Sequence, residues 1–304
     1  MKLSLIIPTY NEKENIKKLF LLLKEDSDKS KIDREIIVVD DNSPDGTGQV
    51  LEELKTKYQN LKIIHRKGKL GLSSAVMEGF QVATGDILGV MDADLSHPTE
   101  KISEMYQMVT TKTNLVIGSR YVKGGRIKGW TLYRKILSKG ATLLARVFIN
   151  VKDPMSGFFM IKKELITNKE INPKGFKILL ELLIKTNCKN IIEIPITFTN
   201  RTVGKSKAGI KEIIYYLRNL FGYLPYKKEI LFQFLKFSFI GLIGTFVNIS
   251  ILYILTEYFN IYYIISAFFA FLVAVTANFI FNKIWTFGEK IYERIVKEYA
   301  NFFL

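Results

Sequence analysis

Two carboxylates, Asp92 and Asp94, stand one residue apart at the end of the apolar run GDILGVM. Burying such charges is costly unless something pairs with them. The residue between them turns the chain out of the pleat, so both side chains approach one point. Mg2+ and Mn2+ prefer oxygen ligands, and Mg2+ commonly binds one or two carboxylates together with substrate phosphates. The spacing therefore predicts a metal-diphosphate site, while the simplest alternative for an Asp-X-Asp pair is a solvated turn or a helix cap.

Polar residues follow two other strand-like runs in the same way. LSLIIP ends in PTYNE, EIIVVDD ends in DDNSPDGT, and ILGVMDAD ends in DADLSHP. In open α/β sheets, ligands bind beyond the carboxyl ends of the strands. We therefore expect three loops rich in acid, amide and hydroxyl groups to meet at one edge of a sheet.

The elements that would position these loops occupy the first part of the chain. Short apolar runs, LKIIH among them, alternate with helical segments that begin near Glu14, Gly48, Ser73 and Thr99. Because the strand-like runs are rich in β-branched residues and apolar on both faces, they predict an α/β fold. The sheet is expected to be parallel, with helices on both faces.

Composition limits the partners of the chain. Its 304 residues carry a formal net charge of +15, which predicts anionic partners. A nucleic-acid-binding protein is disfavoured, because the sequence lacks a basic helix or an aromatic platform that would specify one. The single cysteine, Cys188, excludes an intramolecular disulfide framework and a cysteine cluster for metal, and it fits a reducing compartment.

Two stretches without any charged side chain lie near the end of the chain, at 237–255 and 261–281. Each has about the 20 residues that an α-helix needs to cross a bilayer core. Lys236 precedes the first stretch and Lys283 follows the second, so the positive-inside rule predicts that both ends of the hairpin are cytoplasmic. The N-terminal apolar run is too short for a signal peptide. We therefore expect an integral membrane protein whose catalytic domain faces the cytoplasm.

Amphipathic segments lie on either side of the last soluble motifs. In about 132–149 and in 209–229, apolar residues at helical spacing oppose lysine and arginine side chains. Either helix could simply pack on the core, but their Lys, Arg and Tyr content beside a hairpin favours helices that lie in the membrane interface. Another amphipathic run over 289–304 stops within an apolar cluster. We expect the sequence to be truncated there, before further spans.

Seven motifs in order carry a family resemblance. IIPTYNE, VVDDNSPDGT, MDADLSHP, GSRYVKGG, YRKILSKGA, DPMSGFF and RTVGKSK resemble the dolichol-phosphate mannose synthases of glycosyltransferase family 2, over about residues 3–228. The hairpin, with FNKIWTF, is similar to the GtrA-like membrane domain of some microbial members, which usually has four spans. The resemblance implies a GT-A (Rossmann-like) catalytic domain over 1–208, a second interface helix over 209–229, a transmembrane hairpin over 230–288 and a further segment over 289–304.

The resemblance also implies an activity and its residues. Members transfer mannose from GDP-mannose to a polyprenyl (dolichyl) phosphate with inversion, and they use Mg2+ or Mn2+. The implied metal ligands are Asp92, Asp94 and Ser96, although some members carry Gln in place of Ser96. The residues implied as catalytic are Asp92, Asp94, Arg120 and Arg134. The implied donor-binding positions are Pro8, Tyr10, Glu12, Val39, Asp41, Asp92, Ala93, Asp94, Ser96, Arg120, Arg201 and Lys207.

The acceptor phosphate needs cations of its own. Arg134 and Ser138 lie four residues apart, so on a helix they share a face and could grip one phosphate. The resemblance assigns both to the lipid phosphate, while the alternative for Arg134 is a headgroup contact without catalysis. Asp153, in DPMSGFF, could orient an arginine.

This chemistry does not require a general base. A phosphate monoester has a second pKa of about 6, so the acceptor is already ionised near neutral pH. We therefore do not expect His97 to act as a catalytic base. Catalysis must come from positioning two anionic substrates and stabilising the leaving diphosphate. For Asp41, a hydrogen bond to base or ribose is favoured over a turn or N-cap role, and Tyr10 could stack on the base.

Two other functions stay open. A polyprenyl-phosphate glucosyltransferase that uses UDP-glucose would share the fold and the appended hairpin, although DADLSHP together with GSRYVKGG favours mannose. In a non-catalytic membrane scaffold or lipid transporter the hairpin would be the functional part. The intact carboxylates and arginines argue against that alternative.

Overall fold

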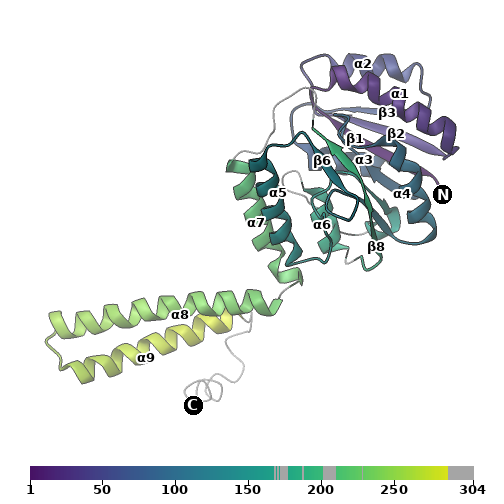
Figure 1. Ribbon diagram of the computed structural model, residues 1–304. Helices are drawn as coiled ribbons and strands as arrows, with labels where there is room; N and C mark the ends of the chain where they lie inside the picture. The colour runs from purple at the N-terminus through teal and green to yellow at the C-terminus, as the bar shows by residue number, and fades with distance from the viewer. Residues whose placement is uncertain are drawn as a thin grey trace. The chain divides into compact units, whose positions relative to one another are not determined.

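The computed structural model describes residues 1–167, 169, 171, 177–186, 188–200, 210–227 and 229–286. The chain divides into two compact units, Met1–Tyr223 and Leu224–Leu304 (Figure 1). The domain boundaries expected after residues 208, 229 and 288 stay predictions.

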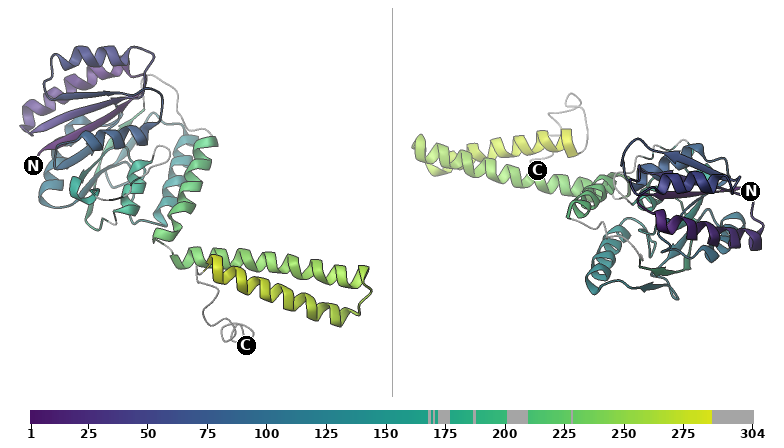
Figure 2. Two further views of the ribbon diagram at one scale, coloured as in Figure 1. Left: turned by 180° about the vertical axis from the view of Figure 1, so that it is seen from behind. Right: turned by 90° about the horizontal axis from the view of Figure 1, so that it is seen from above.

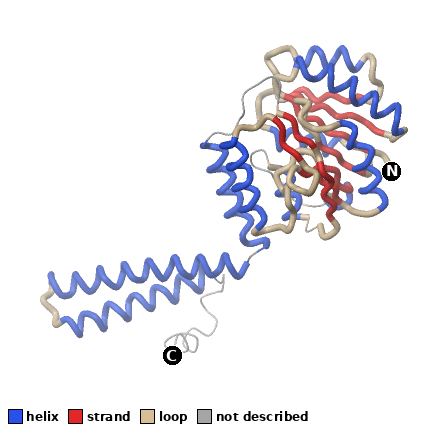
Figure 3. The backbone as a smooth tube through the Cα atoms, viewed as in Figure 1, coloured by secondary structure: helices blue, strands red, loops and turns tan. Residues whose placement is uncertain are grey.

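A seven-stranded sheet forms the centre of the first unit (Figure 3). Its strand order is β3-β2-β1-β4-β7-β5-β8. Both β1 and β2 are buried along their whole length, which explains why their sequences are apolar on both faces. The strands are β1 (Leu3–Thr9), β2 (Arg34–Asp40), β3 (Leu61–His65), β4 (Ile87–Val90), β5 (Leu115–Ser119), β7 (Phe159–Lys162) and β8 (Ile191–Pro195).

The sheet is mixed, so the prediction of a parallel sheet is wrong at one strand. β7 runs antiparallel to β4 and β5 on its two sides, whereas the other pairs of the sheet are parallel. An apolar run such as FFMIK carries no information about strand direction. In the turn before β7, the Ser156 hydroxyl donates to the Gly118 carbonyl (2.7 Å) and accepts from the Phe158 N–H (3.1 Å).

Helices cover both faces of the sheet, as predicted. On one face the buried side chains of α1 (Lys13–Ser30), α2 (Thr47–Lys55) and α4 (Ile102–Thr111) pack on the strands. On the other face those of α3 (Leu72–Val82) and α6 (Ile178–Lys185) do so. The predicted helix starts near Glu14, Gly48 and Ser73 are confirmed to within one residue, and a 3-10 turn at Thr99–Lys101 leads into α4.

Two amphipathic helices, α5 (Leu132–Arg146) and α7 (Ile210–Lys227), run side by side (Figure 2). The Tyr216 hydroxyl of α7 donates to the Ala141 carbonyl of α5 (2.6 Å). Their inner faces form a small core in which Ala145, Tyr216 and Leu220 are buried. Their outer faces leave large apolar side chains more than half exposed, namely Leu132, Tyr133, Ile136, Leu143, Tyr215 and Phe221. Each helix therefore has one face on the core and another apolar face that the described residues do not cover.

A two-stranded parallel sheet connects these helices to the site. It pairs β6 (Arg126–Lys128) with β9 (Thr197–Thr199). β6 leads into α5, and β9 ends beside it at Asn200, which donates from its backbone N–H to the Lys128 carbonyl (3.0 Å).

The second unit contains a helical hairpin of α8 (Glu229–Tyr253) and α9 (Tyr263–Phe281), each continued by a π-helical turn. Phe232–Tyr258 and Tyr263–Thr286 are long and apolar enough to cross a membrane, and they overlap the two charge-free stretches of the sequence.

Small residues line the contact between α8 and α9. Ser266, Ala270 and Ala274 are buried at a spacing of four on α9. Asn278 continues this row and lies against Gly244, where an added Cβ would be only 2.2 Å from the Asn278 Oδ1 atom. Small side chains let helix backbones approach closely in a bilayer.

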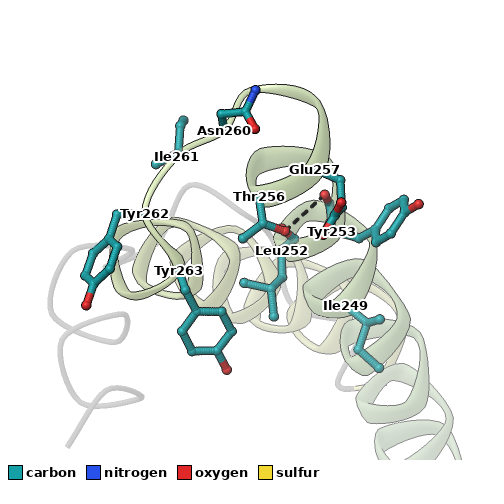
Figure 4. A pocket seen from close by; sticks show the side chains of 9 residues that line it. All are labelled: Ile249, Leu252, Tyr253, Thr256, Glu257, Asn260, Ile261, Tyr262 and Tyr263. Carbon is teal, nitrogen blue, oxygen red and sulfur yellow. Dashed lines mark hydrogen bonds between the residues drawn. The ribbon is translucent and has the colours of Figure 1, made fainter.

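The turn of the hairpin is rich in tyrosine (Figure 4). Tyr253, Tyr262 and Tyr263 are each more than half exposed and line one pocket together with Glu257 and Asn260. Amphipathic aromatic rings of this kind are typical of a membrane–water interface.

Candidate active site

The loops that follow β1 and β2 are joined at the carboxyl edge of the sheet. The Asn11 N–H donates to the Ser43 hydroxyl (3.0 Å), and the Glu12 N–H donates to the Thr47 hydroxyl (3.0 Å). Both loops therefore belong to one surface, next to the loop that follows β4. The expected convergence is confirmed for the first two loops by these bonds.

The loop after β4 holds the paired carboxylates. Asp94 is 2% exposed and accepts the Ser96 N–H at Oδ1 (3.1 Å), whereas the Asp92 side chain is 22% exposed. Leu95, directly after Asp94, adopts a left-handed conformation (φ 61°) that turns the chain toward Ser96. Ala93, between the carboxylates, is buried. The loop is thus a tight turn with one carboxylate inside and one at the surface.

The donor set of this loop fits a divalent metal. The Ser96 hydroxyl oxygen is buried and has no hydrogen-bond partner among the described residues. Such an oxygen is costly to bury unless a ligand satisfies it. With Asp92 and Asp94 it could supply three hard oxygen ligands. The described part of the chain has no group of three or more His, Cys, Asp or Glu side chains that could hold a metal. A metal held here must therefore take further ligands from water or from a substrate.

His97 is fixed beside the carboxylates rather than aimed at a substrate. Its Nδ1 accepts the Asp92 N–H (3.1 Å), so in the neutral ring the proton is on Nε2, which lies 4.0 Å from Asp92 Oδ2. The ring stacks on Phe158 (5.2 Å between centroids) and meets the edge of Phe198 (5.4 Å). His97 therefore holds the backbone of the Asp92 loop.

Asp41 bonds to the loop between β3 and α3, a role that neither interpretation of the sequence predicted. Its carboxylate accepts hydrogen bonds from Arg66 Nη1 (2.7 Å), Leu70 N–H (2.8 Å) and Gly71 N–H (2.9 Å). Asp41 thereby anchors the loop between β3 and α3. The turn at Ser43 is held by the preceding carboxylate, Asp40, which accepts the Ser43 N–H (3.3 Å).

The remaining predicted donor positions line the first two strands. Pro8 and Val39 are buried opposite each other in the register of β1 and β2. Tyr10 carries the ammonium of Lys69 over its ring, 3.8 Å from the centroid. Glu12 accepts a hydrogen bond from Asn15 Nδ2 (2.7 Å) at the start of α1. A base that stacks on Tyr10 at this face would take the place of Lys69.

Arg120 and Asp153 form a buried bidentate ion pair. Arg120 Nε and Nη2 donate to the two carboxylate oxygens at 2.8 and 2.7 Å, and the Arg120 backbone N–H adds a third bond at 2.9 Å. The hypothesis that Asp153 orients an arginine is confirmed. Burial by itself lowers the pKa of Arg120, but the hydrogen bonds and the charge of Asp153 outweigh it and raise the pKa above its usual value.

The two predicted acceptor residues share one face of α5. Arg134 Nη1 donates to the Asn200 Oδ1 atom (3.0 Å), and its guanidinium carbon lies 4.1 Å from the centroid of the Trp130 ring. Ser138 accepts a hydrogen bond from the Tyr121 hydroxyl (2.8 Å). The structure therefore gathers Arg120, Arg134 and Ser138 around two aromatic rings. Arg201 and Lys207 lie outside the described residues.

Lys177 is a basic residue near the Arg120–Asp153 pair that the sequence did not point to. Burial first, and then the positive charges of Arg120 and Arg134, lower its pKa to about 7, while the negative charges of Asp153 and Asp92 act in the opposite direction. The residue precedes the apolar run of α6 and belongs to no recognisable motif. Only its three-dimensional position next to the Arg120–Asp153 pair identifies it.

The mixed sheet, with an Asp-X-Asp turn after β4 and arginines near it, defines the class: a GT-A glycosyltransferase. Solved structures with this fold include mannosyl-3-phosphoglycerate synthase from Rubrobacter xylanophilus (TM-score 0.57, 14% identity, 74% of each chain covered). Another is the Pyrobaculum calidifontis mannosyltransferase PcManGT in complex with GDP-Man and Mn2+ (TM-score 0.50, 17% identity, 71% of this chain and 63% of that chain).

Sequence comparison gives the family. Residues 4–168 match glycosyl transferase family 2, and residues 236–304 match the GtrA/DPMS transmembrane domain. The dolichol-phosphate mannosyltransferase of Pyrococcus furiosus is 42% identical over 98% of this chain and 85% of its own length. That of Saccharomyces cerevisiae is 41% identical over 71% of this chain and 85% of its own length. The chain is a glycosyltransferase of family 2 and belongs to the dolichol-phosphate mannosyltransferase family, as the motifs indicated.

Proposed function

We propose that this enzyme transfers mannose from GDP-mannose to a polyprenyl (dolichyl) phosphate, with inversion and with a divalent metal, at the cytoplasmic face of a membrane. The observation that carries the proposal is the placement of Arg134 and Ser138 on one face of α5, close to the Arg120–Asp153 pair and beside uncovered apolar residues. The names of the relatives agree with this substrate pair.

The donor half of the site would be built on anionic and cationic groups together. Asp92, Asp94 and Ser96 would hold Mg2+ or Mn2+, which when bound offsets the charge of the donor diphosphate. Pro8, Tyr10, Glu12, Val39 and Asp41 would line the nucleotide, with Tyr10 stacking on the base. Arg120 and Lys177 would add positive charge where the leaving diphosphate develops its own negative charge. Arg201 and Lys207 are proposed as further donor contacts from the family motif alone.

The acceptor half would supply the nucleophile without a base. Arg134 and Ser138 would hold the ionised phosphate of the lipid, and one of its oxygens would attack C1 of mannose from the side opposite the diphosphate. The new C1–O bond forms as the bond from C1 to the GDP oxygen breaks, and GDP leaves with the electron pair. The configuration at C1 is inverted. His97, whose Nδ1 is held by the Asp92 backbone, has no proton to remove in this reaction.

The membrane would present the acceptor. The outer faces of α5 and α7 combine exposed apolar residues with exposed cations such as Lys139 and Arg146, which suits an anionic bilayer surface. The hairpin of α8 and α9 would anchor the chain, with Lys236 and Lys283 at the cytoplasmic end and the tyrosines of the turn at the far interface. The proposed organisation is a GT-A domain over 1–208, an interface helix over 209–229 and a membrane hairpin over 230–288.

Transfer from labelled sugar nucleotides tests the proposal. Membranes containing the protein should transfer label from GDP-mannose, and not from UDP-glucose, to an added polyprenyl phosphate. Transfer only from UDP-glucose would contradict the donor assignment in favour of a glucosyltransferase. Asp94→Ala should abolish transfer while membrane insertion persists. If the protein transfers neither sugar, the scaffold or lipid-transporter alternative would replace an enzymatic function.

A further inference from the structure

One indole ring lies within reach of both arginines of the site. The guanidinium carbon of Arg134 is 4.1 Å from the Trp130 ring centroid, and that of Arg120 is 5.4 Å from it. Both distances fall within the roughly 6 Å over which a ring face attracts a cation. The Trp130 ring therefore contacts both guanidinium groups, and the shorter distance makes Arg134 its principal partner.

Trp130 is itself supported by contact with Phe198. Its ring meets the ring of Phe198 edge-on (5.5 Å, 74°), and Phe198 is buried and contacts His97. Asn200 braces the same point, because its Nδ2 donates to the Gly129 carbonyl (3.1 Å) while its Oδ1 accepts from Arg134 (3.0 Å). The position of the Arg134 guanidinium is thus set by a stacked ring and an amide, both fixed to β9.

Tyr121 supports the second acceptor residue. Its hydroxyl donates to Ser138 Oγ (2.8 Å), and its ring lies 5.4 Å from the guanidinium carbon of Arg120. A serine hydroxyl that accepts one hydrogen bond still has its own proton to donate. The bond from Tyr121 therefore leaves the Ser138 proton available for an anionic oxygen.

We propose that Trp130 and Tyr121 are positioning residues for the acceptor phosphate. Trp130 holds the Arg134 guanidinium by stacking, and Tyr121 orients the Ser138 hydroxyl. Both rings also lie 5.4 Å from the guanidinium carbon of Arg120, but Asp153 holds that arginine independently through a bidentate pair. The inference rests on the proposed function, because it takes Arg134 and Ser138 as the residues that bind the lipid phosphate.

Steady-state kinetics with farnesyl phosphate as a short acceptor tests the proposal on the full chain. Trp130→Leu should raise the KM for farnesyl phosphate about tenfold, the loss expected for a partly desolvated cation–ring contact, and leave the KM for GDP-mannose within about twofold. Trp130→Phe, which keeps a ring, should restore part of the loss. Tyr121→Phe should raise the acceptor KM by about two- to tenfold, the range for one neutral hydrogen bond.

Two matched controls separate positioning from general destabilisation. Trp285→Leu makes the same change at the other tryptophan of the chain, and Tyr106→Phe removes a hydroxyl that bonds to the Met1 carbonyl far from α5. Neither should change the acceptor KM. An unchanged acceptor KM in Trp130→Leu and Tyr121→Phe would overturn the proposal, and so would equal rises in the KM values of donor and acceptor.

Fluorescence gives a second readout that does not depend on transfer. The chain has two tryptophans, so Trp285→Phe leaves Trp130 as the only one. Its emission should shift when Arg134→Ala is added, and also when farnesyl phosphate binds, whereas inorganic phosphate at the same concentration should give a smaller shift. An emission maximum that shifts neither with Arg134→Ala nor with farnesyl phosphate would overturn the stacking role. A wild-type protein that transfers no mannose would instead refute the proposed function, and the shift with Arg134→Ala would still test the stack.

Discussion

Asp153 accepts three hydrogen bonds from Arg120, two from the guanidinium and one from the backbone N–H. Asp153 is fully buried and Arg120 is 9% exposed, so the pair fixes the arginine before any substrate arrives. Asp153 is held in turn by its own N–H, which donates to Glu193 Oε1 (2.9 Å) on β8. Asp153 therefore joins the turn before β7 to the end of β5 through its carboxylate and to β8 through its backbone N–H.

Removing the charge of Asp153 should destabilise the catalytic domain. We expect Asp153→Asn to cost about 3–5 kcal/mol, because it leaves the buried Arg120 without its counter-charge. Thermal unfolding of the detergent-solubilised protein should show a melting midpoint lower by several degrees. Glu104→Gln, in the more exposed Lys101–Glu104 pair (2.6 Å), should cost no more than about 1 kcal/mol. Equal midpoints for the two variants would contradict the role of the buried pair.

Donor binding should take up protons through Lys177. Its pKa of about 7 means that at pH 8 the folded protein holds this side chain mostly neutral. A diphosphate nearby favours the charged form and raises the pKa, so binding at pH 8 should consume protons, and it should consume fewer below pH 6, where Lys177 is already protonated. Calorimetry of GDP-mannose binding in two buffers of different ionisation enthalpy measures this uptake. The dependence on buffer should disappear in Lys177→Met; if it persists there, another group is responsible.

Gly129 should resist replacement even by alanine. Its φ of 78° is a left-handed conformation, and an added Cβ would lie 2.8 Å from the Cβ of Asn200. Gly129→Ala should therefore push Asn200 away from Arg134 and raise the acceptor KM several-fold. Gly140→Ala is the control on α5, because nothing lies within 4 Å of its new methyl group. That variant should keep the acceptor KM and gain up to about 1 kcal/mol of stability. Identical kinetics in both variants would rule out the Asn200 brace.

The orientation of the hairpin can be tested by labelling its turn. In a Cys188→Ala background, which removes the single cysteine, Asn260→Cys should react with a membrane-impermeant maleimide added outside intact cells. Lys57→Cys, on the exposed surface of the catalytic domain, should react only in inverted vesicles or lysed cells. The reverse pattern would place the catalytic domain outside the cell.

Local patterns were sufficient for much of the fold. The alternation of strands and helices, the start of α1 and the polar loops after β1, β2 and β4 follow from neighbours in the sequence. The motif DPMSGFF was sufficient to suggest the pairing of Asp153 with an arginine, because an acid in a turn beside arginine-bearing loops has few other partners. The direction of β7 could not be predicted from the sequence, since its apolar side chains fit a parallel and an antiparallel ladder equally well.

The site residues that were missed depend on distant partners. Trp130 matters through Arg134, Phe198 and Asn200, and Tyr121 through Ser138, all brought together by β6, β9 and α5. A single aromatic residue in a polar loop gives no sign of such contacts. Asp41 shows the converse case: its partners Arg66, Leu70 and Gly71 lie 25 to 30 residues away, so the turn or N-cap role suggested by its immediate neighbours was the wrong one.

Because β7 is antiparallel to β4, the residues that precede β7, and not those that follow it, lie at the edge of the sheet where the candidate site is. Because β7 starts at the edge where β4 ends, with Phe159 opposite Val90, the residues that come before it face the same loops as the residues that come after β4. Gly157 lies so close to the Asp92 carboxylate that an added Cβ would be 3.2 Å from it, and Asp153 arrives from the same turn. In the sequence of this enzyme, the polar loop residues therefore come after a parallel strand such as β4, but before the antiparallel strand β7. A search restricted to the residues after each apolar run would overlook Asp153 and Gly157, which come before β7.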